Sequence, residues 1–287
     1  MKHLFKICTS IESDMPTISV DGTVVGADVI YDHHREGGSE IQLHEIPDSI
    51  AIESPTLFVS PSLDEDCVIS TAVILKNGAR HIDTSIYVEL EKASMACDQL
   101  TEPNELFYLL KDYDAQLIEE YGANAKSVRY EKLVNAVLYY IDQGFINDLN
   151  ESWKGYFKSY LKKQETLILS KGMVTFLSDT VAYINIKKYG YVSPPIIYST
   201  LRKTGHKIAL IEYRSPHSGR VYSLGIDPIT SIDKNLVFNI FDCLNTKDLY
   251  ISPSNKWGGR AGVGGSPQIE GSFLSPHEIA KWIKVTI

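Results

Sequence analysis

The sequence predicts an α/β protein with three parts. A mostly parallel sheet domain with flanking helices is followed by a helical connector and a smaller mixed α/β C-terminal domain. Three observations predict this class. Short β-prone runs alternate with helical runs over the first hundred residues, residues 103–163 are helical in pattern, and β-rich runs return from Leu167 onward. We therefore place the domain boundaries at 1–115, 116–165 and 166–287.

Apolar strands that end in acidic residues organise the first part. The predicted strands are Met15–Val20, Val24–Tyr31, Leu57–Ser60 and Arg80–Ile82, and the predicted helices are Cys67–Leu75 and Tyr87–Cys97. Asp21, Asp32, Asp64 and Asp83 follow the strands in that order. The ends of parallel strands gather along one edge of a sheet, and carboxylate and imidazole groups gathered there suit divalent cations.

Several of these residues have an alternative structural role. Asp64 and Asp66 can reach two adjacent metal ions, or they can cap the helix that follows. His81 and Asp83 are equally open to a structural or a ligand role. The adjacent pair His33 and His34 either presents ligand groups at the end of a strand or has no function by itself.

Composition limits the possible partners. The chain has 287 residues, 44% hydrophobic residues and a net charge of −8. A protein that binds long duplex nucleic acid usually has a basic surface, so we expect a small phosphorylated substrate or short oligonucleotide. The four cysteines lack zinc-type spacing, and no signal peptide or 18-residue apolar run is apparent. We expect a cytoplasmic protein with reduced thiols and no membrane partner.

The middle of the chain is predicted to be helical. The segment Trp153–Lys163 is aromatic and basic, which is typical of a nucleic-acid surface or of an amphipathic linker helix. Beyond it, the predicted strands are Leu167–Leu169, Met173–Phe176, Val181–Ile186, Ile208–Tyr213 and Arg220–Ile226, and the predicted helices are Pro195–Leu201 and Pro276–Ile283. A hairpin turn is predicted at Ser215–Gly219.

A glycine-rich stretch near the end predicts a loop. Five glycines fall within residues 258–265, followed by Ser266. Such a loop either exposes backbone N–H groups to an anion or is a plain turn. Arg260, Arg214 and Arg220 are candidate phosphate-binding residues, with surface salt bridges as the alternative.

Five stretches together resemble the DHH phosphoesterase superfamily. Asp32-His33-His34-Arg35 after an apolar strand is similar to its signature. Residues 17–22, 60–70 and 93–98 resemble the stretches that hold the other aspartates of that family. Residues 264–271 resemble the Gly-Gly-His loop of its associated C-terminal domain. The motif order differs from the family pattern, as in a circular permutation, and serines 60 and 266 replace two family histidines.

The resemblance implies a role for each residue. Asp21 would bridge two metal ions, Mn²⁺ or Mg²⁺, and Asp64 would join the first site, which Ser60 weakens. The second site would consist of Asp66, His33 and Asp98. Asp32 and His34 would be catalytic, with His34 acting on the scissile phosphate as charge stabiliser or proton donor. Substrate contacts would come from Arg260, Gly264, Gly265, Ser266, Arg214 and Arg220.

The expected function is metal-dependent hydrolysis of a small phosphodiester in a cleft between two domains. The alternative is a non-catalytic nucleotide-binding module that has lost part of its metal site. The intact Asp and His residues favour the enzyme, and the two serines favour the binding module.

Overall fold

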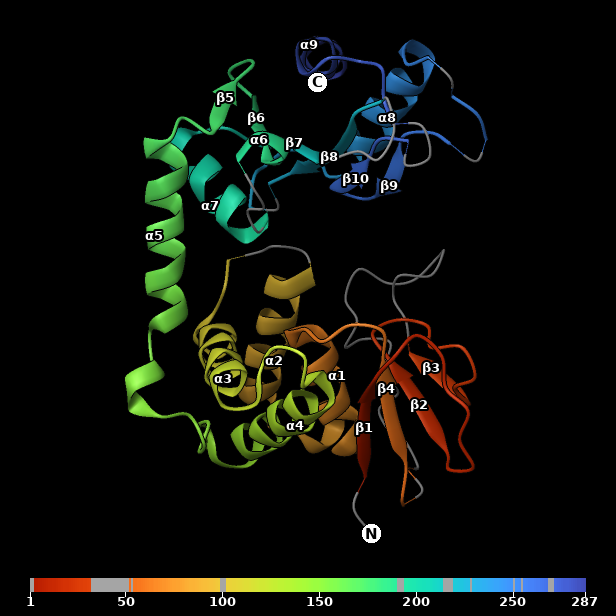
Figure 1. Ribbon diagram of the computed structural model, residues 1–287, viewed down its shortest axis with the longest axis vertical. Coiled ribbons are helices and arrows are strands. Elements are labelled where there is room, and N and C mark those ends of the chain that lie inside the picture. Colours follow the sequence, from red (N-terminus) through yellow and green to blue (C-terminus); the bar gives the residue numbers. More distant parts are fainter. Residues whose placement is uncertain are drawn as a thin grey trace. The chain divides into compact units, whose positions relative to one another are not determined.

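The chain divides into two compact units, Met1–Ser159 and Tyr160–Ile287 (Figure 1). The computed structural model describes residues 3–31, 52, 54–98, 102–189, 194–213, 219–227, 229–249, 251–253, 255–267 and 271–287. Within these ranges, each helix is too short or too polar to cross a bilayer.

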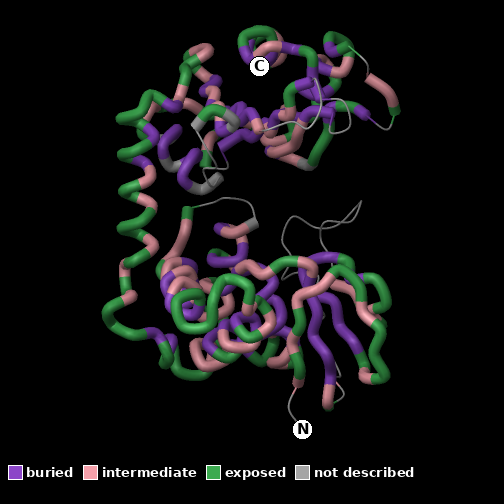
Figure 2. Tube along the Cα trace, in the orientation of Figure 1, coloured by how far each residue is buried: buried purple, intermediate pink, exposed green. Residues whose placement is uncertain are grey.

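The first unit contains a four-stranded parallel sheet. Its strands are β1 (Leu4–Ile7), β2 (Thr17–Val20), β3 (Val29–Tyr31) and β4 (Leu57–Ser60), in the order β1-β4-β2-β3. The two central strands, β2 and β4, are buried along their whole length, whereas β1 and β3 at the edges are half exposed (Figure 2). Full burial of the central strands is typical of a parallel sheet covered on both faces. The predicted parallel sheet is confirmed.

Four helices complete the core of this unit. They are α1 (Glu65–Leu75), α2 (Thr84–Asp98), α3 (Glu105–Tyr121) and α4 (Lys126–Gln143). Helix α1 packs against the other three, and α4 also packs along β1. The Tyr130 hydroxyl of α4 lies 2.6 Å from the Thr71 hydroxyl of α1 inside the core. Helix α1 begins shortly after the end of β4 in the chain.

Most of the predicted connector belongs to the first unit. Helix α4 contributes Tyr130, Leu133, Val134 and Val137 to the same buried core as Phe58 of β4, and the first compact unit extends to Ser159. The three-part division at 115/116 and 165/166 stays a prediction. After a short turn, η3 (Glu151–Trp153), helix α5 (Tyr156–Ser170) begins within the first unit. Asp112 of α3 accepts hydrogen bonds of 2.7 Å from the backbone N–H groups of Gly155 and Phe157, which fixes the start of α5.

Two predicted strands are helical instead. Residues Ala79–His81 form a 3₁₀ turn, η2, in which the N–H of Ile82 donates to the carbonyl of Ala79 at 3.0 Å. Leu167–Leu169 belongs to α5, where Ile168 is buried and its two neighbours are exposed. One buried residue in three consecutive apolar residues fits the period of a helix. In both cases the predicted run of three residues was too short to distinguish a strand from a helix.

The second unit is a six-stranded mixed sheet with helices. The strands are β5 (Val174–Phe176), β6 (Val181–Asn185), β7 (Ile208–Tyr213), β8 (Val221–Ile226), β10 (Val263–Gly265) and β9 (Gly258–Arg260), in this spatial order. Only the β6–β7 pair is parallel among these strand pairs. The helices are α6 (Ile186–Tyr189), α7 (Pro194–Thr204), α8 (Leu236–Lys247) and α9 (Pro276–Thr286). The two-domain α/β class is confirmed.

The predicted glycine loop is a β-hairpin, and this corrects its interpretation. Gly264 of β10 pairs with Gly259 of β9, and a Cβ atom on Gly264 would lie 2.3 Å from Cζ of Phe241 in α8. A Cβ atom on Gly259 would lie 2.3 Å from the carbonyl oxygen of Val263. Close packing against a helix and between strands therefore explains these two glycines without any anion.

Candidate active site

The candidate active site lies at the carboxyl edge of the first sheet. Strands β2 and β3 are in register with Val20 beside Tyr31, and β4 runs parallel to β2 on its other side. Asp21 follows β2, Asp32 follows β3 in the sequence, and Asp64 and Asp66 follow β4. Parallel α/β sheets bind their ligands at this edge. The sequence prediction of converging strand ends is confirmed for β2, β3 and β4.

The turn after β2 holds Asp21 in an uncommon backbone conformation. Asp21 has a φ of 55° and is 4% exposed. Its N–H donates to the carbonyl of Tyr31 at 2.9 Å, and the Ser19 hydroxyl donates to the carbonyl of Gly22 at 2.5 Å. Asp is one of the residue types that tolerate positive φ, and such conformations are frequent at functional sites. The fold therefore fixes a buried carboxylate at the end of β2.

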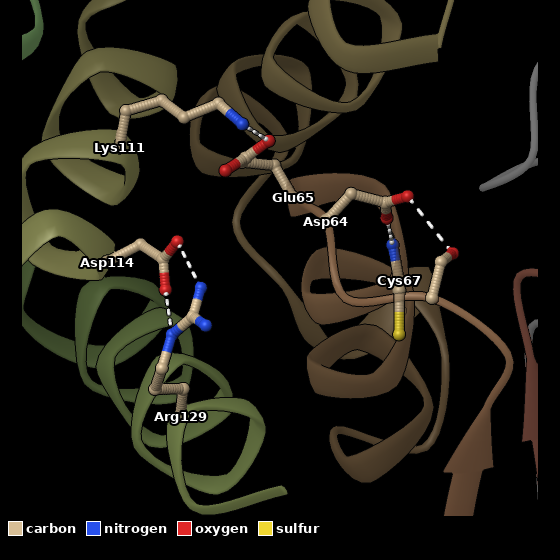
Figure 3. Close-up of polar contacts among 7 residues, drawn as sticks. Asp64, Glu65, Cys67, Lys111, Asp114 and Arg129 are labelled. Atoms are coloured by element: carbon tan, nitrogen blue, oxygen red, sulfur yellow. Dashed lines mark hydrogen bonds and ion pairs between the residues drawn. The ribbon is translucent and has the colours of Figure 1, made fainter. Parts of the chain in front are cut away.

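Asp64 caps helix α1. Its Oδ1 accepts a hydrogen bond of 3.0 Å from the N–H of Cys67, and its Oδ2 accepts one of 3.3 Å from the Ser62 hydroxyl (Figure 3). The capping alternative for Asp64 is thus confirmed, and its role as a metal ligand stays a prediction. Asp64, Glu65 and Asp66 all lie at the N-terminal end of α1, where the helix dipole stabilises negative charge.

Asp66 connects α1 to α2. It is 2% exposed and accepts a hydrogen bond from the Ser94 hydroxyl of α2. Asp98 ends α2 one helical turn beyond Ser94, and its side chain lies outside the described part of the structure. The Ser94–Asp66 bond therefore brings the last turn of α2 to the first turn of α1.

The charges of these carboxylates reach the buried thiol of Cys67 and the half-buried thiol of Cys97. Burial raises the pKa of the Cys67 thiol well above its usual range, and the charges of Asp64 and Asp21 raise it further. Burial likewise raises the pKa of Cys97, and Glu65, Asp64 and Asp66 add to the shift. Both thiols stay protonated at neutral pH, which excludes them as nucleophiles.

Ser60, His81 and Asp83 have structural contacts. The Ser60 side chain is fully buried and hydrogen-bonds the Cys67 thiol, while its oxygen accepts from the N–H of Ser62 at 3.4 Å. The imidazole of His81 accepts from Arg80 at 2.9 Å, and Asp83 accepts from the N–H of Ser85 at 2.8 Å before α2. His81 and Asp83 are exposed, in keeping with their structural alternative.

Two residues of the expected substrate-binding loop line a groove on the second unit. Gly264 and Gly265 form part of its wall together with Tyr213, Val221, Tyr222 and Ser223, and the groove has a volume of about 460 Å³. A space of this size falls within the usual range for small-molecule sites. This finding is compatible with the predicted substrate contacts, which stay a prediction.

The other expected substrate-binding residues differ in exposure. Ser266 is 2% exposed, and its hydroxyl accepts from the N–H of Tyr222 at 2.9 Å. Arg220 is exposed, and its guanidinium donates to the Tyr222 hydroxyl at 3.4 Å. Arg260 lies in β9. The position of Arg214 and the side chain of Arg260 lie outside what the structure describes.

The donor types at the first sheet fit a hard divalent ion. Asp21, Asp64 and Asp66 supply carboxylate oxygens, the ligands that Mn²⁺ and Mg²⁺ prefer. Among the described residues, however, no three His, Cys, Asp or Glu side chains are grouped closely enough to hold an ion. A complete ligand set therefore depends on the DHH signature residues 32–35 and on the Asp98 side chain, which lie outside the described residues.

Three residues beside the carboxylates, Ser94, Glu65 and Lys111, were not predicted from the sequence. Ser94 bonds Asp66, and Glu65 forms an ion pair with Lys111 of α3. Glu65 stands between two candidate ligands in the sequence, and this position could have indicated that it lies near the site. Nothing in the sequence indicates the position of Lys111, because only the packing of α3 on α1 brings it to Glu65.

Comparisons with known proteins find similar chains among the solved structures. No protein-family model and no curated protein matches the chain. Among solved structures, the chain is similar to a pGpG-specific phosphodiesterase, PggH, from Vibrio cholerae, with 12% sequence identity and a TM-score of 0.47. The similarity covers 95% of this chain and 99% of that one. Similarity at this level leaves the function to be inferred from the residues of the chain itself.

Proposed function

We propose that the chain is a metal-dependent phosphoesterase that hydrolyses a small phosphodiester such as a short oligonucleotide or a nucleotide. The observation that supports this most is the position of Asp21, Asp64 and Asp66 at one sheet edge, beside the strand that leads into Asp32-His33-His34. Two of these carboxylates are almost fully buried. Burying charge in this way is costly unless a partner compensates it, and a bound cation is such a partner.

We assign Asp21, Asp64, Asp66, His33 and Asp98 as the residues that hold Mn²⁺ or Mg²⁺. The metal, once bound, polarises the phosphate and lowers the pKa of a water molecule toward neutrality. Asp21 is held by its turn, Asp66 by Ser94, and Asp64 by the end of α1, so their carboxylates are oriented before the metal arrives. Asp32 and His34 are proposed as the catalytic pair.

Substrate binding is proposed for the groove of the second unit. The backbone at Gly264 and Gly265 lines this groove. Together with Ser266 and the guanidinium groups of Arg220, Arg214 and Arg260, it is proposed to contact the phosphate. The net charge of −8 supports a small substrate over a long duplex. A cleft between the domains and a cytoplasmic location stay predictions.

A specific observation favours the alternative, a nucleotide-binding module without catalysis. The hydroxyls of Ser60 and Ser266 are both buried and used in structural hydrogen bonds. Neither hydroxyl is therefore placed to replace the imidazole found in the resembled family.

Hydrolysis of bis(p-nitrophenyl) phosphate and of linear dinucleotides, measured with and without Mn²⁺, tests the proposal. Asp66→Asn and Asp32→Ala/His33→Ala are expected to lower turnover by about 100-fold, the upper range for disturbed metal sites. Asp142→Asn, an exposed carboxylate paired with Lys76, serves as the matched control and should keep wild-type turnover. Equal turnover in all variants contradicts the proposal, and saturable nucleotide binding without turnover supports the binding module.

A further inference from the structure

A partly buried ion pair lies beside the candidate metal ligands: the Glu65 side chain is buried, whereas that of Lys111 is 28% exposed. The Lys111 ammonium is 2.6 Å from Oε2 of Glu65, whose side chain is 6% exposed (Figure 3). The pair joins the middle of α3 to the first residue of α1. It is distinct from the ligand set proposed above, which includes neither residue.

The place of Glu65 in the chain couples the ion pair to two ligands. Glu65 stands between Asp64, the N-cap of α1, and Asp66 in the first turn, so the regular helical backbone couples the positions of the three residues. A buried carboxylate that loses its cation is strongly destabilised, so the backbone around it is expected to shift toward solvent. Such a shift displaces Asp64 and Asp66 together.

Aromatic side chains define the position of the ammonium. It lies 5.4 Å from the ring centroid of Phe107 and 5.9 Å from that of Phe157. Burial lowers the pKa of Lys111, but the charge of Glu65, the hydrogen bond to Glu65 and the charge of Asp114 act together with smaller effects to raise the pKa above its ordinary value. Lys111 is therefore a fixed positive charge rather than a mobile surface lysine.

We propose that Lys111 is a positioning residue: its ion pair with Glu65 holds the first turn of α1 so that Asp64 and Asp66 can bind a divalent metal ion. The inference rests on the proposed metal-dependent function and deepens it. Lys111 acts through Glu65 and touches neither ligand nor substrate.

The sign of the effect separates positioning from plain electrostatics. A positive charge near a cation site repels the cation, so removal of Lys111 would strengthen metal binding if charge alone mattered. Loss of positioning weakens metal binding instead. The two roles thus predict opposite changes in the dissociation constant of Mn²⁺.

Titration of the metal-free full chain with Mn²⁺, followed by electron paramagnetic resonance of the free ion, measures this constant. The variants are Lys111→Met, which breaks the pair, and Glu65→Gln/Lys111→Met, which removes both charges. Lys158→Met is the matched control, because Lys158 also lies 2.6 Å from a glutamate, Glu105, and over a ring, Tyr108, but is exposed. Should Lys111→Met fail to fold, Lys111→Leu replaces it, since it also breaks the pair and keeps an apolar side chain in a helix.

We expect Lys111→Met to raise the Mn²⁺ dissociation constant by about tenfold or more, a typical effect of removing a support of a metal ligand. The double variant should return to within about threefold of wild type, and Lys158→Met should not differ. At saturating Mn²⁺, kcat and KM of Lys111→Met should match wild type. A merely structural defect would reduce the number of binding sites without changing the constant.

An unchanged or lower dissociation constant in Lys111→Met overturns the inference, as does equal weakening in the single and double variants. If wild type binds Mn²⁺ and Lys111→Met binds it equally well, only the inference fails. If wild type binds no Mn²⁺, the proposed function and the inference fail together.

Discussion

The N–H of Asp21 donates a hydrogen bond of 2.9 Å to the carbonyl oxygen of Tyr31. This bond ties the turn after β2 to the last residue of β3, directly before Asp32 in the sequence. Asp21 and Asp32, which are eleven positions apart in the chain, therefore follow two strands that end side by side at the sheet edge. The bond depends on the geometry of the turn, and Gly22 is the residue that permits this geometry.

Replacement of Gly22 by alanine is expected to destabilise the first unit by about 2–4 kcal/mol. Its φ of 129° disfavours any side chain, and a Cβ atom would lie 2.5 Å from Cγ of Pro61. Urea denaturation measures the loss. Gly122→Ala separates the two causes, because Gly122 also has a positive φ of 84° but no atom within 4 Å of the added Cβ. The control should cost about 1 kcal/mol, and equal costs would contradict the role of Pro61.

Loss of the Ser94 hydroxyl is expected to weaken both folding and metal binding. Ser94→Ala removes a donor from the buried carboxylate of Asp66 and should cost about 1–3 kcal/mol of unfolding free energy. The same variant should raise the Mn²⁺ dissociation constant, as measured by titration of the metal-free chain.

Ser170→Ala is the matched control for this change. The Ser170 hydroxyl donates to the carbonyl of Leu167 at 3.1 Å on the exposed end of α5, so its loss should change stability by less than about 0.5 kcal/mol. An effect of Ser94→Ala no larger than that of Ser170→Ala would show that the bond to Asp66 contributes nothing.

Local sequence patterns were sufficient to predict the two central strands of the first sheet. Each central strand is a short apolar run that ends in a turn signal, such as Asp21-Gly22 after β2. Parallel strands have their carboxyl ends at the same edge of a sheet. The convergence of Asp21 and Asp64 was therefore predictable without knowledge of packing. By contrast, β1, whose residues alternate between exposed and half buried, was not identified as a strand.

Long-range packing was not predictable. The contact of Lys111 with Glu65 joins residues that are 46 positions apart, and nothing in the local sequence of α3 indicates it. Helix α8 was likewise not predicted, although Val237, Ile240, Phe241 and Leu244 form its buried face. The glycines of β9 and β10 were assigned to a loop, because the ring of Phe241, which leaves no room for a side chain at Gly264, comes from that unpredicted helix.

Alanine at Gly264 is expected to destabilise the second unit by about 1–3 kcal/mol. The added methyl group would lie 2.3 Å from Cζ of Phe241 and 2.4 Å from the carbonyl oxygen of Gly258. Trp257 is buried and stacks near Phe241, at 6.4 Å between ring centroids, so its fluorescence follows the urea transition. Phe241→Leu in the same chain should recover part of the loss.

Gly258→Ala is the control within the same hairpin. No atom lies within 4 Å of the Cβ position at Gly258, so this variant should stay within about 0.5 kcal/mol of wild type. If both glycine variants lose equal stability, backbone freedom rather than the contact with Phe241 would be the reason for glycine at position 264.

The carboxyl of Asp112 is expected to make stability fall as pH rises through the acidic range. Burial raises the pKa of Asp112 above its ordinary value, although the N–H groups of Phe157 and Gly155 oppose this shift. Between the ordinary pKa and the raised one, the folded chain binds more protons than the unfolded chain. Unfolding free energy therefore decreases with pH across that interval. Relative to Asp112→Asn, wild type should be most stable below the ordinary pKa and lose that advantage as pH rises.

Asp28→Asn provides a control of opposite sign. Hydrogen bonds from the side chain and backbone of Thr17 lower the pKa of Asp28, so the advantage of wild type over this variant should grow as pH rises through the acidic range. Urea denaturation of the three proteins between about pH 3 and pH 7 measures both trends. An advantage over Asp112→Asn that grows with pH would mean that the two backbone hydrogen bonds at the start of α5 outweigh the burial of the charge.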